Sequence, residues 1–268
     1  LEEATRDGGC VAVIRNTVTR AQETARHLRE HFGADAVRLH HSRFIATHRA
    51  AREAVLRDEL GPDPTDRPGL RILVGTQVLE QSLDIDADLM VTDLAPVDLM
   101  LQRAGRLPRH PRGPGESERP APLRRARVVV TGIEGWDETG VPVPARGSRS
   151  IYGDSRLLRS AAALRLRPDS TTAITLPNDI RPLVESAYAV QPEVPADWLD
   201  QVSEADGRYR AALEEARGRA DQFRLPSIRE LGGSLVGWLA DSSTEAEDGR
   251  SQGSTRVRDG EDGIEVIV

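Results

Sequence analysis

The residues best suited to phosphate chemistry form an arginine motif in the middle of the chain. Residues 102–109 read Gln-Arg-Ala-Gly-Arg-Leu-Pro-Arg, which fits the pattern Q-R-x-G-R-x-x-R. Arg106 and Arg109 are three residues apart, so they can project from one face of a turn. Guanidinium groups that converge on a γ-phosphate stabilise the charge of its transfer, and one such group is worth about 10³–10⁵ in rate. The motif therefore predicts a site for phosphoryl chemistry.

An acidic segment precedes this motif. Residues 76–98 hold six acidic residues and no basic one, whereas residues 99–127 hold eight Arg and two Glu. Arginines neutralise phosphates, and a carboxylate accepts hydrogen bonds from ribose hydroxyls. The segregation therefore favours a polyanion site with a bound sugar, and the alternative is a pair of solvated charged faces.

The basic residues of the chain are all arginine. Its 268 residues include 36 Arg and no Lys, and the net charge is -7. A phosphate-binding loop of the G-x-x-x-x-G-K-[ST] type needs its Lys, and Schiff-base catalysis needs a Lys amine. The chain by itself can perform neither chemistry. Its net negative charge also argues against a polycation that seeks nucleic acid as a whole.

Alternating strands and helices within the first 132 residues are expected to position the motif. Short Val-rich apolar runs predict strands, and apolar residues three and four apart predict amphipathic helices. This alternation indicates an α/β fold with a parallel sheet covered by helices on both faces. The predicted strands are Cys10–Ile14, Ala36–Leu39, Ile72–Gly75, Leu89–Val91 and Arg127–Thr131. The predicted helices are Val18–Phe32, with a capping box of Thr19 and Gln22, Ala46–Leu60 and Pro96–Leu107.

The alternation of predicted strands and helices does not continue in the second half of the sequence. Gly, Pro and Ser interrupt Ile133–Ser150, so we place a linker at 133–150 between a first domain at 1–132 and a second at 151–268. The second domain is expected to be smaller and mainly helical, and its acidic segment 241–263 predicts a flexible loop. Its predicted helices are Asp154–Leu166, Asp179–Ala189 and Ala196–Phe223, with a short extended piece at Ala173–Leu176.

The ends of the sequence suggest a piece of something larger. Leu1–Arg6 reads like part of a helix already under way, and Ile264–Val268 is an apolar strand that stops at the last residue. A folded domain seldom ends on an unpaired strand. The single Cys10 excludes an internal disulfide framework. No apolar run approaches the roughly 18 residues of a membrane span, so we expect a soluble, cytoplasmic protein.

Five short strings carry a family resemblance: Val13–Val18, Leu39–Phe44, Gly75–Asp86, Asp93–Pro96 and Gln102–His110. Together they resemble the second RecA-like domain of a superfamily-two helicase, and more narrowly the CRISPR-associated helicase–nuclease of type I systems. The string Gly75–Asp86 is far more specific than the arginine motif, which many helicases share. The likeness covers about residues 8–132, and 151–188 and 223–226 look similar to that family's C-terminal accessory region.

The resemblance implies roles for particular side chains. Arg106 and Arg109 would be catalytic arginine fingers that face ATP. Gln102 and Arg103 would bind the nucleotide, and Asp84 would hold its ribose. Donors such as Thr and Asn grip a nucleic-acid backbone without reading bases, which suits a sequence-blind motor. The implied contacts to single-stranded DNA are Asn16, Thr17, Thr76 and Arg43.

The family resemblance also implies an activity for the whole protein. It would be an ATP-dependent single-stranded-DNA translocase or helicase that unwinds and helps degrade invading DNA in antiviral defence. Its implied partners are single-stranded DNA, a first RecA-like lobe, a nuclease domain and a guide-RNA surveillance complex, with no membrane. The chain has no phosphate-loop Lys, no D-E-x-[DH] string and no His-Asp pair. Mg ligands are therefore expected in the first lobe, and the chain alone is expected to be inactive.

Three other interpretations stay open at this stage. The chain could be a non-catalytic RecA-like fragment that binds nucleic acid or a partner helicase lobe. A flavodoxin-like fold shares the layered architecture, and fold alone fixes no function. His27, Glu30 and His31 match H-x-x-E-H, a metalloprotease string whose two His would share a helix face. So short a match is more often a solvated helix flank, and no metal is expected.

Overall fold

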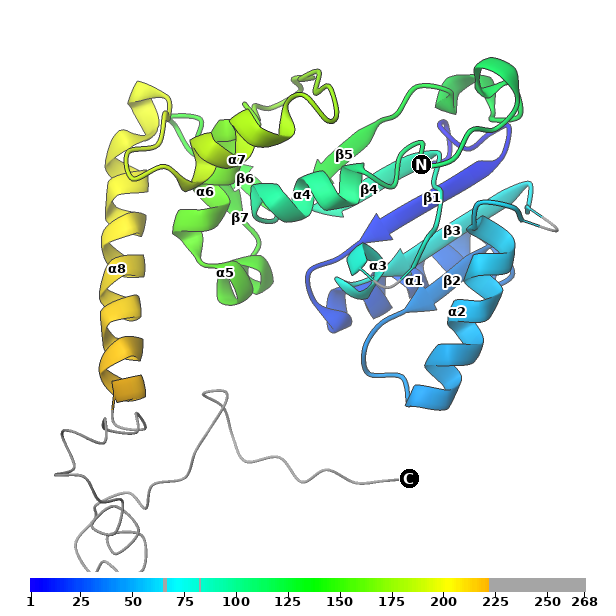
Figure 1. Ribbon diagram of the computed structural model, residues 1–268, viewed down its shortest axis with the longest axis horizontal. Helices are drawn as coiled ribbons and strands as arrows, with labels where there is room; N and C mark the ends of the chain where they lie inside the picture. The colour runs from blue at the N-terminus through cyan, green and yellow to red at the C-terminus, as the bar shows by residue number, and fades with distance from the viewer. Residues whose placement is uncertain (65–66, 82, 222–268) are drawn as a thin grey trace, which may run out of the picture. The chain divides into compact units, whose positions relative to one another are not determined.

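The computed structural model describes residues 1–64, 67–81 and 83–221, and a five-stranded sheet forms its centre (Figure 1). The strands lie in the order β2-β3-β1-β4-β5, and every neighbouring pair is parallel. Every residue of β1 and β4 is buried, because helices cover both faces. The predicted α/β fold and its five strands are confirmed, with strand ends shifted by one or two residues. The strands are β1 Gly9–Ile14, β2 Val37–His40, β3 Leu70–Gly75, β4 Leu89–Asp93 and β5 Val128–Thr131.

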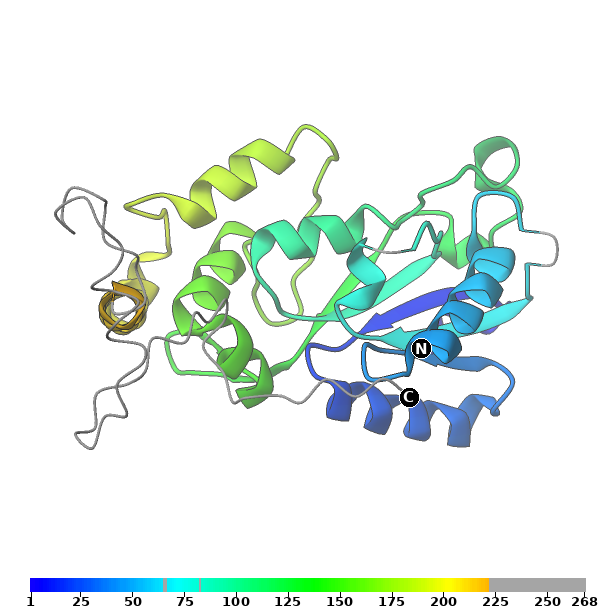
Figure 2. The same ribbon diagram turned by 60° about the horizontal axis from the view of Figure 1, so that its bottom comes forward.

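Helix α1, Val18–Phe32, covers one face of the sheet (Figure 2). Its buried residues Ala21 and Ala25 pack against Val11 and Val13 of β1. These helix residues are four apart, so they lie on the same face of α1. The small side chains let the helix approach the sheet closely.

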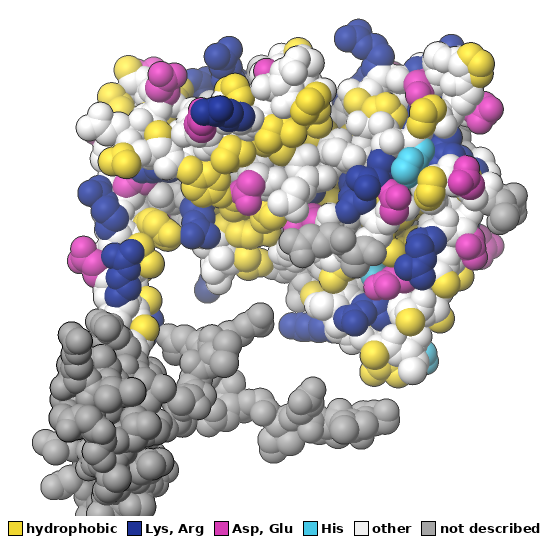
Figure 3. All heavy atoms as spheres, in the orientation of Figure 1, with side chains coloured by type: hydrophobic (Ala, Val, Ile, Leu, Met, Phe, Trp, Pro, Cys, Tyr) yellow, Lys and Arg dark blue, Asp and Glu magenta, His cyan; other side chains and the backbone are white. Residues whose placement is uncertain are grey.

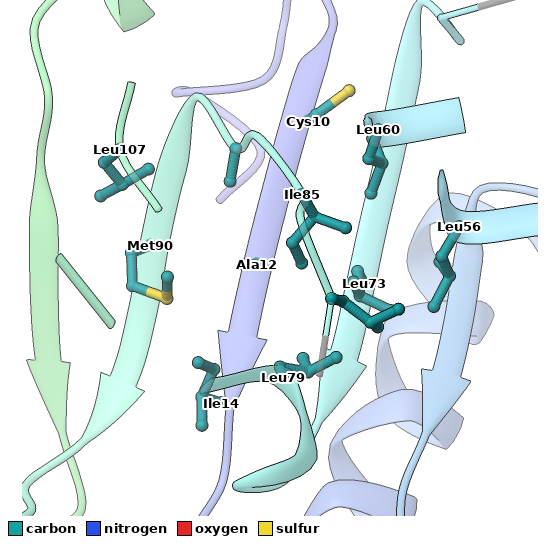
Figure 4. Packing of buried hydrophobic residues seen from close by; sticks show 12 residues of the cluster. Cys10, Ala12, Ile14, Leu56, Leu60, Leu73, Leu79, Ile85, Met90 and Leu107 are labelled. Carbon is teal, nitrogen blue, oxygen red and sulfur yellow. The ribbon is translucent and has the colours of Figure 1, made fainter. Parts of the chain in front are cut away.

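Helices α2, Ala46–Leu60, and α3, Val78–Gln81, lie on the opposite face. Figure 4 shows Leu79 of α3 beside Ile14 of β1 and Leu56 of α2 on the side of Leu73 of β3, and all four belong to one buried cluster with Ala12 of β1. Alternate residues of β1 thus contribute to two different cores, as the period of a strand requires. The sheet is thereby held from both sides.

The N-terminus of α1 corrects one sequence prediction. Thr17 is the N-cap, and its Oγ1 accepts a hydrogen bond from the N–H of Arg20 at 3.3 Å. The predicted capping box of Thr19 and Gln22 is wrong because Thr19 already lies in the first turn of the helix. The cap instead falls on a residue of the loop that follows β1.

The arginine motif spans the end of a helix. Pro96–Leu107 was predicted as one helix, but α4 covers only Val97–Ala104, and Gly105 is its C-cap. The following residues continue as turns. The first half of the motif is therefore helical and the second half is irregular. Two short 3-10 helices, η1 Pro114–Glu116 and η2 Ala121–Leu123, precede β5.

The segment Ile133–Ser150 is not a plain loop, and that prediction is wrong. Strands β6, Ile133–Trp136, and β7, Pro142–Pro144, form an antiparallel pair, and α5, Arg146–Tyr152, follows directly. A two-stranded ribbon has only edge strands, where Pro is tolerated. The Pro and Gly residues therefore mark a hairpin here.

The rest of the described chain is mainly helical, as predicted, although α6 ends three residues before the predicted Leu166 and irregular segments separate the helices. The buried Trp198 packs with Leu157 of α6 and Val202 of α8. Ala173–Leu176, predicted as extended, forms no strand. The elements are α6 Asp154–Ala163, α7 Ile180–Tyr188, the 3-10 helix η3 Ala196–Trp198 and α8 Leu199–Asp221.

Contacts group Leu1–Asp206 into one compact unit, and Gly207 begins a second. The hairpin and α5 thus belong to the same compact unit as the parallel sheet, and the linker at 133–150 between two domains stays a prediction. Leu1–Arg6, predicted as part of a helix, forms turns, with the N–H of Thr5 donating to the carbonyl of Leu1. The acidic segment 241–263, the string 223–226 and the predicted strand 264–268 lie outside the described residues.

The surface of the first unit is uneven in character. Figure 3 shows hydrophobic side chains gathered over α4, α6 and α7, whereas Arg, Asp and Glu side chains intermingle over α2 and the neighbouring sheet. In the part of the chain that the structure describes, no helix is both long and apolar enough to span a membrane.

Candidate functional site

The side chains predicted to contact DNA gather at one edge of the sheet. Asn16 and Thr17 follow β1, Arg43 lies three residues after β2, and Thr76 follows β3. Gly75 at the end of β3 is in register with both Ile14 of β1 and His40 of β2. Because the carboxyl ends of parallel strands share an edge, the three loops lie together. Their side chains differ in access: Arg43 is exposed and Thr17 half-buried, whereas Asn16 and Thr76 are buried.

Asn16 uses both of its side-chain N–H donors inside the protein. Its Nδ2 donates to the carbonyl of Leu94 and to Oγ of Ser148, both at 2.8 Å. Its Oδ1 accepts from Arg103 at 3.1 Å, and its backbone carbonyl accepts from Gln77 at 2.9 Å. A buried amide that bonds to three separate segments holds the loops together. In this arrangement its side chain has no donor to offer a phosphate.

Arg103 is the centre of the same buried network. Its side chain is fully buried and forms an ion pair of 2.6 Å with Glu80. It also donates to Oγ1 of Thr92 at 2.6 Å and to the carbonyl of Asp93 at 2.8 Å. Burial raises the pKa of Glu80, and the ion pair with Arg103 opposes this only in part. Arg103, which the sequence assigned to ATP, thus ties α4 to α3, β4 and the loop after β1.

Asp93 completes this network, and sequence reasoning did not single out its role. Its buried carboxylate accepts from Nη1 of Arg15 at 2.8 Å and from the N–H of Asn16 at 3.2 Å. It also lies 3.1 Å from Nε of Arg20. The available signal was an acidic residue at the end of an apolar strand. A depression of about 210 Å³ opens beside it, lined by the loop after β1, the first turn of α1 and the start of α5.

Arg109 and Asp84, both predicted to face ATP, pair with each other outside the buried network of Arg103. Nε of Arg109 donates to Oδ1 of Asp84, and Nε2 of His110 lies 3.0 Å from the same oxygen. Desolvation of Asp84 acts to raise its pKa, but the hydrogen bonds from Arg109 and His110 outweigh it and keep the pKa below its ordinary value. The Arg109 side chain is 38% exposed and that of Asp84 48%. Solvent and ligands can therefore reach this pair.

Arg106 and Gln102, the other members of that set, have contrasting environments. Arg106 is buried, and its guanidinium donates to the carbonyls of Leu83 and Glu80. Burial and the neighbouring Arg109 lower its pKa. Arg106 thus holds the segment that follows α3. Gln102 is exposed on α4.

A second buried cluster supports the Arg109 segment, and no sequence pattern identified it. Oδ1 of Asp86 accepts from the backbone N–H groups of Arg109, at 2.8 Å, and His110. Asp86 also binds the side chains of Arg112 and Arg119, at 2.8 and 2.9 Å. Desolvation of Asp86 would raise its pKa, but these hydrogen bonds outweigh it and lower the pKa. Arg112 and Arg119 of the arginine-rich segment therefore hold the protein backbone in place, and their guanidinium groups are engaged inside the protein.

The H-x-x-E-H string lies on the exposed flank of α1. The rings of His27 and His31 are 4.8 Å apart, and Nδ1 of His27 lies 3.8 Å from Glu30. Among the residues that the structure describes, no group of three or more His, Cys, Asp or Glu side chains is arranged to hold a metal ion. The zinc-hydrolase alternative gains no support from this geometry.

Comparison with known proteins relates the sheet edge near Thr17 and the Asp84–Arg109 pair to one family. Residues 7–112 match the family described as CRISPR-associated nuclease/helicase Cas3, C-terminal. The CRISPR-associated nuclease/helicase Cas3 of Streptococcus thermophilus is 39% identical over 277 residues, which cover 100% of this chain and 28% of that protein. The chain thus spans less than a third of the length of this relative.

Solved structures agree with the sequence matches. A crystal structure of T. fusca Cas3 with ATP has a TM-score of 0.72 and 32% identity, covering 88% of this chain and 25% of that one. A chain in a CRISPR RNA-guided surveillance complex, in a pre-nicking state, has a TM-score of 0.59 and 32% identity, covering 76% of this chain and 24% of that one. Nucleotide binding thus occurs in this family. The chain belongs to the Cas3 family of CRISPR-associated nuclease/helicases, and residues 7–112 represent part of the C-terminal region of these proteins.

Proposed function

We propose that this chain is the second RecA-like lobe, with the following accessory region, of an ATP-dependent single-stranded-DNA translocase or helicase in type I CRISPR defence. The observation that carries the proposal is the Cas3 relationship over the whole chain, joined to two separate regions, each suited to one ligand. In this proposal 1–132 is the motor lobe, 133–150 the connection and 151–268 the accessory domain. The protein would work in the cytoplasm.

The nucleotide side of the proposal rests on the exposed ion pair. Arg109 would leave Asp84 to contact the γ-phosphate, and Asp84 would then be free to accept from the ribose hydroxyls. This exchange costs little because a half-exposed ion pair contributes about 0–1 kcal/mol. Arg106 is buried, so it would act as a finger only after a rearrangement of its carbonyl contacts, and otherwise it positions the Asp84 segment. Gln102 is accessible on α4 for a direct contact to the nucleotide.

The DNA side rests on the edge where β1, β2 and β3 end. Thr17 and Arg43 have access to solvent and would contact phosphates of the strand. Asn16 and Thr76 are buried, so we assign them to holding the loops at the edge. Contacts to phosphate alone fix position without reading sequence, which a motor needs.

The remaining functions belong to segments outside this chain. A first RecA-like lobe would supply the Lys-containing phosphate loop and the Mg ligands, and a nuclease domain would cut DNA. A similar chain occurs in a guide-RNA surveillance complex, so we propose such a complex as the partner. The chain alone would be inactive. A non-catalytic binding fragment is the second candidate, supported by the absence of Lys from the sequence.

Reconstitution tests the proposal. The chain is mixed with the rest of the Streptococcus thermophilus relative, from which the matching 277-residue segment has been removed. ATP hydrolysis should require both proteins and Mg, and single-stranded DNA should stimulate it. The apparent DNA affinity should fall linearly with salt on a double-logarithmic plot. Hydrolysis that is unaffected by this chain would favour the binding-fragment function.

A further inference from the structure

Helix α5, Arg146–Tyr152, follows the β6–β7 hairpin and lies beyond residues 7–112, which match the Cas3 family. It nevertheless contacts the DNA-side edge of the sheet at three points. Each contact involves a different residue of the helix and one of the loops after β1 and β3. Together these contacts suggest a role for α5 that the motifs do not reveal.

Ser148 makes the first contact. Its side chain is buried, and its Oγ accepts from Nδ2 of Asn16 at 2.8 Å. The carbonyl of Leu94 accepts the second hydrogen of the same amide. Without the hydroxyl of Ser148, one buried N–H of Asn16 would have no acceptor, and such a group is costly to leave unpaired. The loop after β1 thus depends on α5.

Tyr152 makes the second contact, one turn along the helix. Nε2 of Gln77 donates to Oη of Tyr152 at 3.0 Å and to the carbonyl of Asn16 at 2.9 Å. Gln77 is the residue after Thr76, so Tyr152 bears on the loop after β3. The helix therefore holds both loops at positions set by one rigid element.

The third contact is a close approach of the Gly147 backbone to Thr17, which the absence of a side chain permits. A Cβ at this position would lie 2.8 Å from Cγ2 of Thr17, closer than carbon atoms normally pack. Thr17 cannot yield easily because its Oγ1 accepts from the N–H of Arg20 as the N-cap of α1. Helix α5 thus approaches Thr17 as closely as a glycine allows.

We propose that α5 is a positioning element for single-stranded DNA: Ser148, Tyr152 and Gly147 fix the loops that carry Asn16, Thr17 and Thr76. The proposal rests on the proposed function, since that function makes this edge the DNA track. The three α5 residues act through the loops rather than by touching the strand. The end of the connection and the first residues of the accessory domain, which together form α5, are thereby coupled to the DNA affinity of the motor lobe.

The first experiment compares two serines of the same helix in the 268-residue chain. Ser148→Ala removes the acceptor of Asn16, whereas Ser150→Ala changes an exposed serine. We expect Ser148→Ala to speed hydrogen exchange at the backbone amides of residues 15–18 and 76–78 and to weaken binding of a labelled oligothymidylate about tenfold. Ser150→Ala should change neither quantity. Tyr152→Phe, which removes one hydroxyl, should show the same two effects on a smaller scale.

The second experiment separates positioning from a loss of helix stability. Gly147→Ala places a better helix former in α5 but crowds Thr17, so binding should weaken although the helix itself is favoured. Gly207→Ala in α8 is the matched control, because no atom of the described residues, apart from the neighbouring helix backbone, lies within 4 Å of its added carbon. Binding should stay unchanged in this control.

The outcomes separate a failure of the α5 proposal from a failure of the proposed DNA function of the sheet edge. Unchanged exchange in Ser148→Ala would overturn the positioning role of α5 whatever the binding result. Faster exchange with unchanged DNA affinity in Ser148→Ala and Gly147→Ala would overturn its role in DNA binding. If the unaltered chain binds no oligothymidylate, at low salt as well, the proposed DNA function of the edge fails, and the α5 proposal fails with it.

Discussion

Arg103 and Arg109 belong to one eight-residue motif, yet the structure places them in opposite environments. Arg103 is fully buried, and four protein groups hold its guanidinium. Arg109 is 38% exposed and pairs with a carboxylate that is itself accessible. A buried, saturated arginine fixes geometry, whereas an exposed one can change partners. The difference favours a structural role for the first and the proposed chemical role for the second.

The end of α4 at Ala104 explains the difference. Arg103 occupies the last turn of the helix and points into the protein, where Glu80 compensates its charge. Arg109 follows Gly105 on an irregular segment whose N–H groups are held by Asp86. If the whole motif were one helix, Arg103, Arg106 and Arg109 would follow each other at three-residue spacing along neighbouring parts of its surface.

The largest stability effect is expected for Arg103→Ala. The substitution leaves the buried carboxylate of Glu80 without its cation, and breaking such a pair costs about 3–5 kcal/mol. Urea unfolding followed by circular dichroism measures this change. Adding Glu80→Gln to the variant should recover part of the loss, because the unpaired charge disappears. Equal effects of Arg103→Ala and Arg109→Ala would break the contrast between the two arginines.

The next effect concerns acid stability at Asp86. Its pKa is held below its ordinary 3.8, so it contributes stability above that value that is lost as pH falls through its lower folded pKa. Asp86→Asn should therefore flatten the acid side of the plot of unfolding free energy against pH, in addition to lowering stability. Burial raises the pKa of Glu80, so this residue contributes the opposite pH dependence. Its contribution to the unfolding free energy is lost as pH rises through its folded pKa. An unchanged acid slope in Asp86→Asn would contradict the assigned network.

The smallest stability effect is expected for Arg109→Ala. Its exposed ion pair with Asp84 is worth less than about 1 kcal/mol. The same urea titration should show little change beside Arg125→Ala, which removes another exposed arginine. A loss as large as that of Arg103→Ala would mean that Arg109 is a structural residue.

The sequence predicted the parallel sheet well because its strands are apolar on both faces, as in β1 and β4. It did not predict the β6–β7 hairpin, since Pro142 and Pro144 read as loop residues and only edge strands accept them. Local patterns also placed the cap of α1 two residues too late.

For the candidate sites, the sequence named loops that the structure brings to one sheet edge, but it did not predict which side chains are accessible. Asn16 and Arg103 fall in the expected strings, yet their burial depends on Ser148 and Glu80, which are distant in the sequence. Hydrogen bonds across 132 and 23 residues leave no periodic signal that a single sequence can carry. Asp86 and Arg119 were missed for the same reason.

The most direct test is ATP turnover by the chain mixed with the rest of the Streptococcus thermophilus relative, in the presence of single-stranded DNA. Arg109→Ala should lower turnover about 10³-fold, in line with the loss of an arginine finger, while its unfolding free energy stays nearly unchanged. Arg125→Ala should turn over ATP like the unaltered chain. Undiminished turnover in Arg109→Ala would contradict the assignment of chemistry to the exposed arginine.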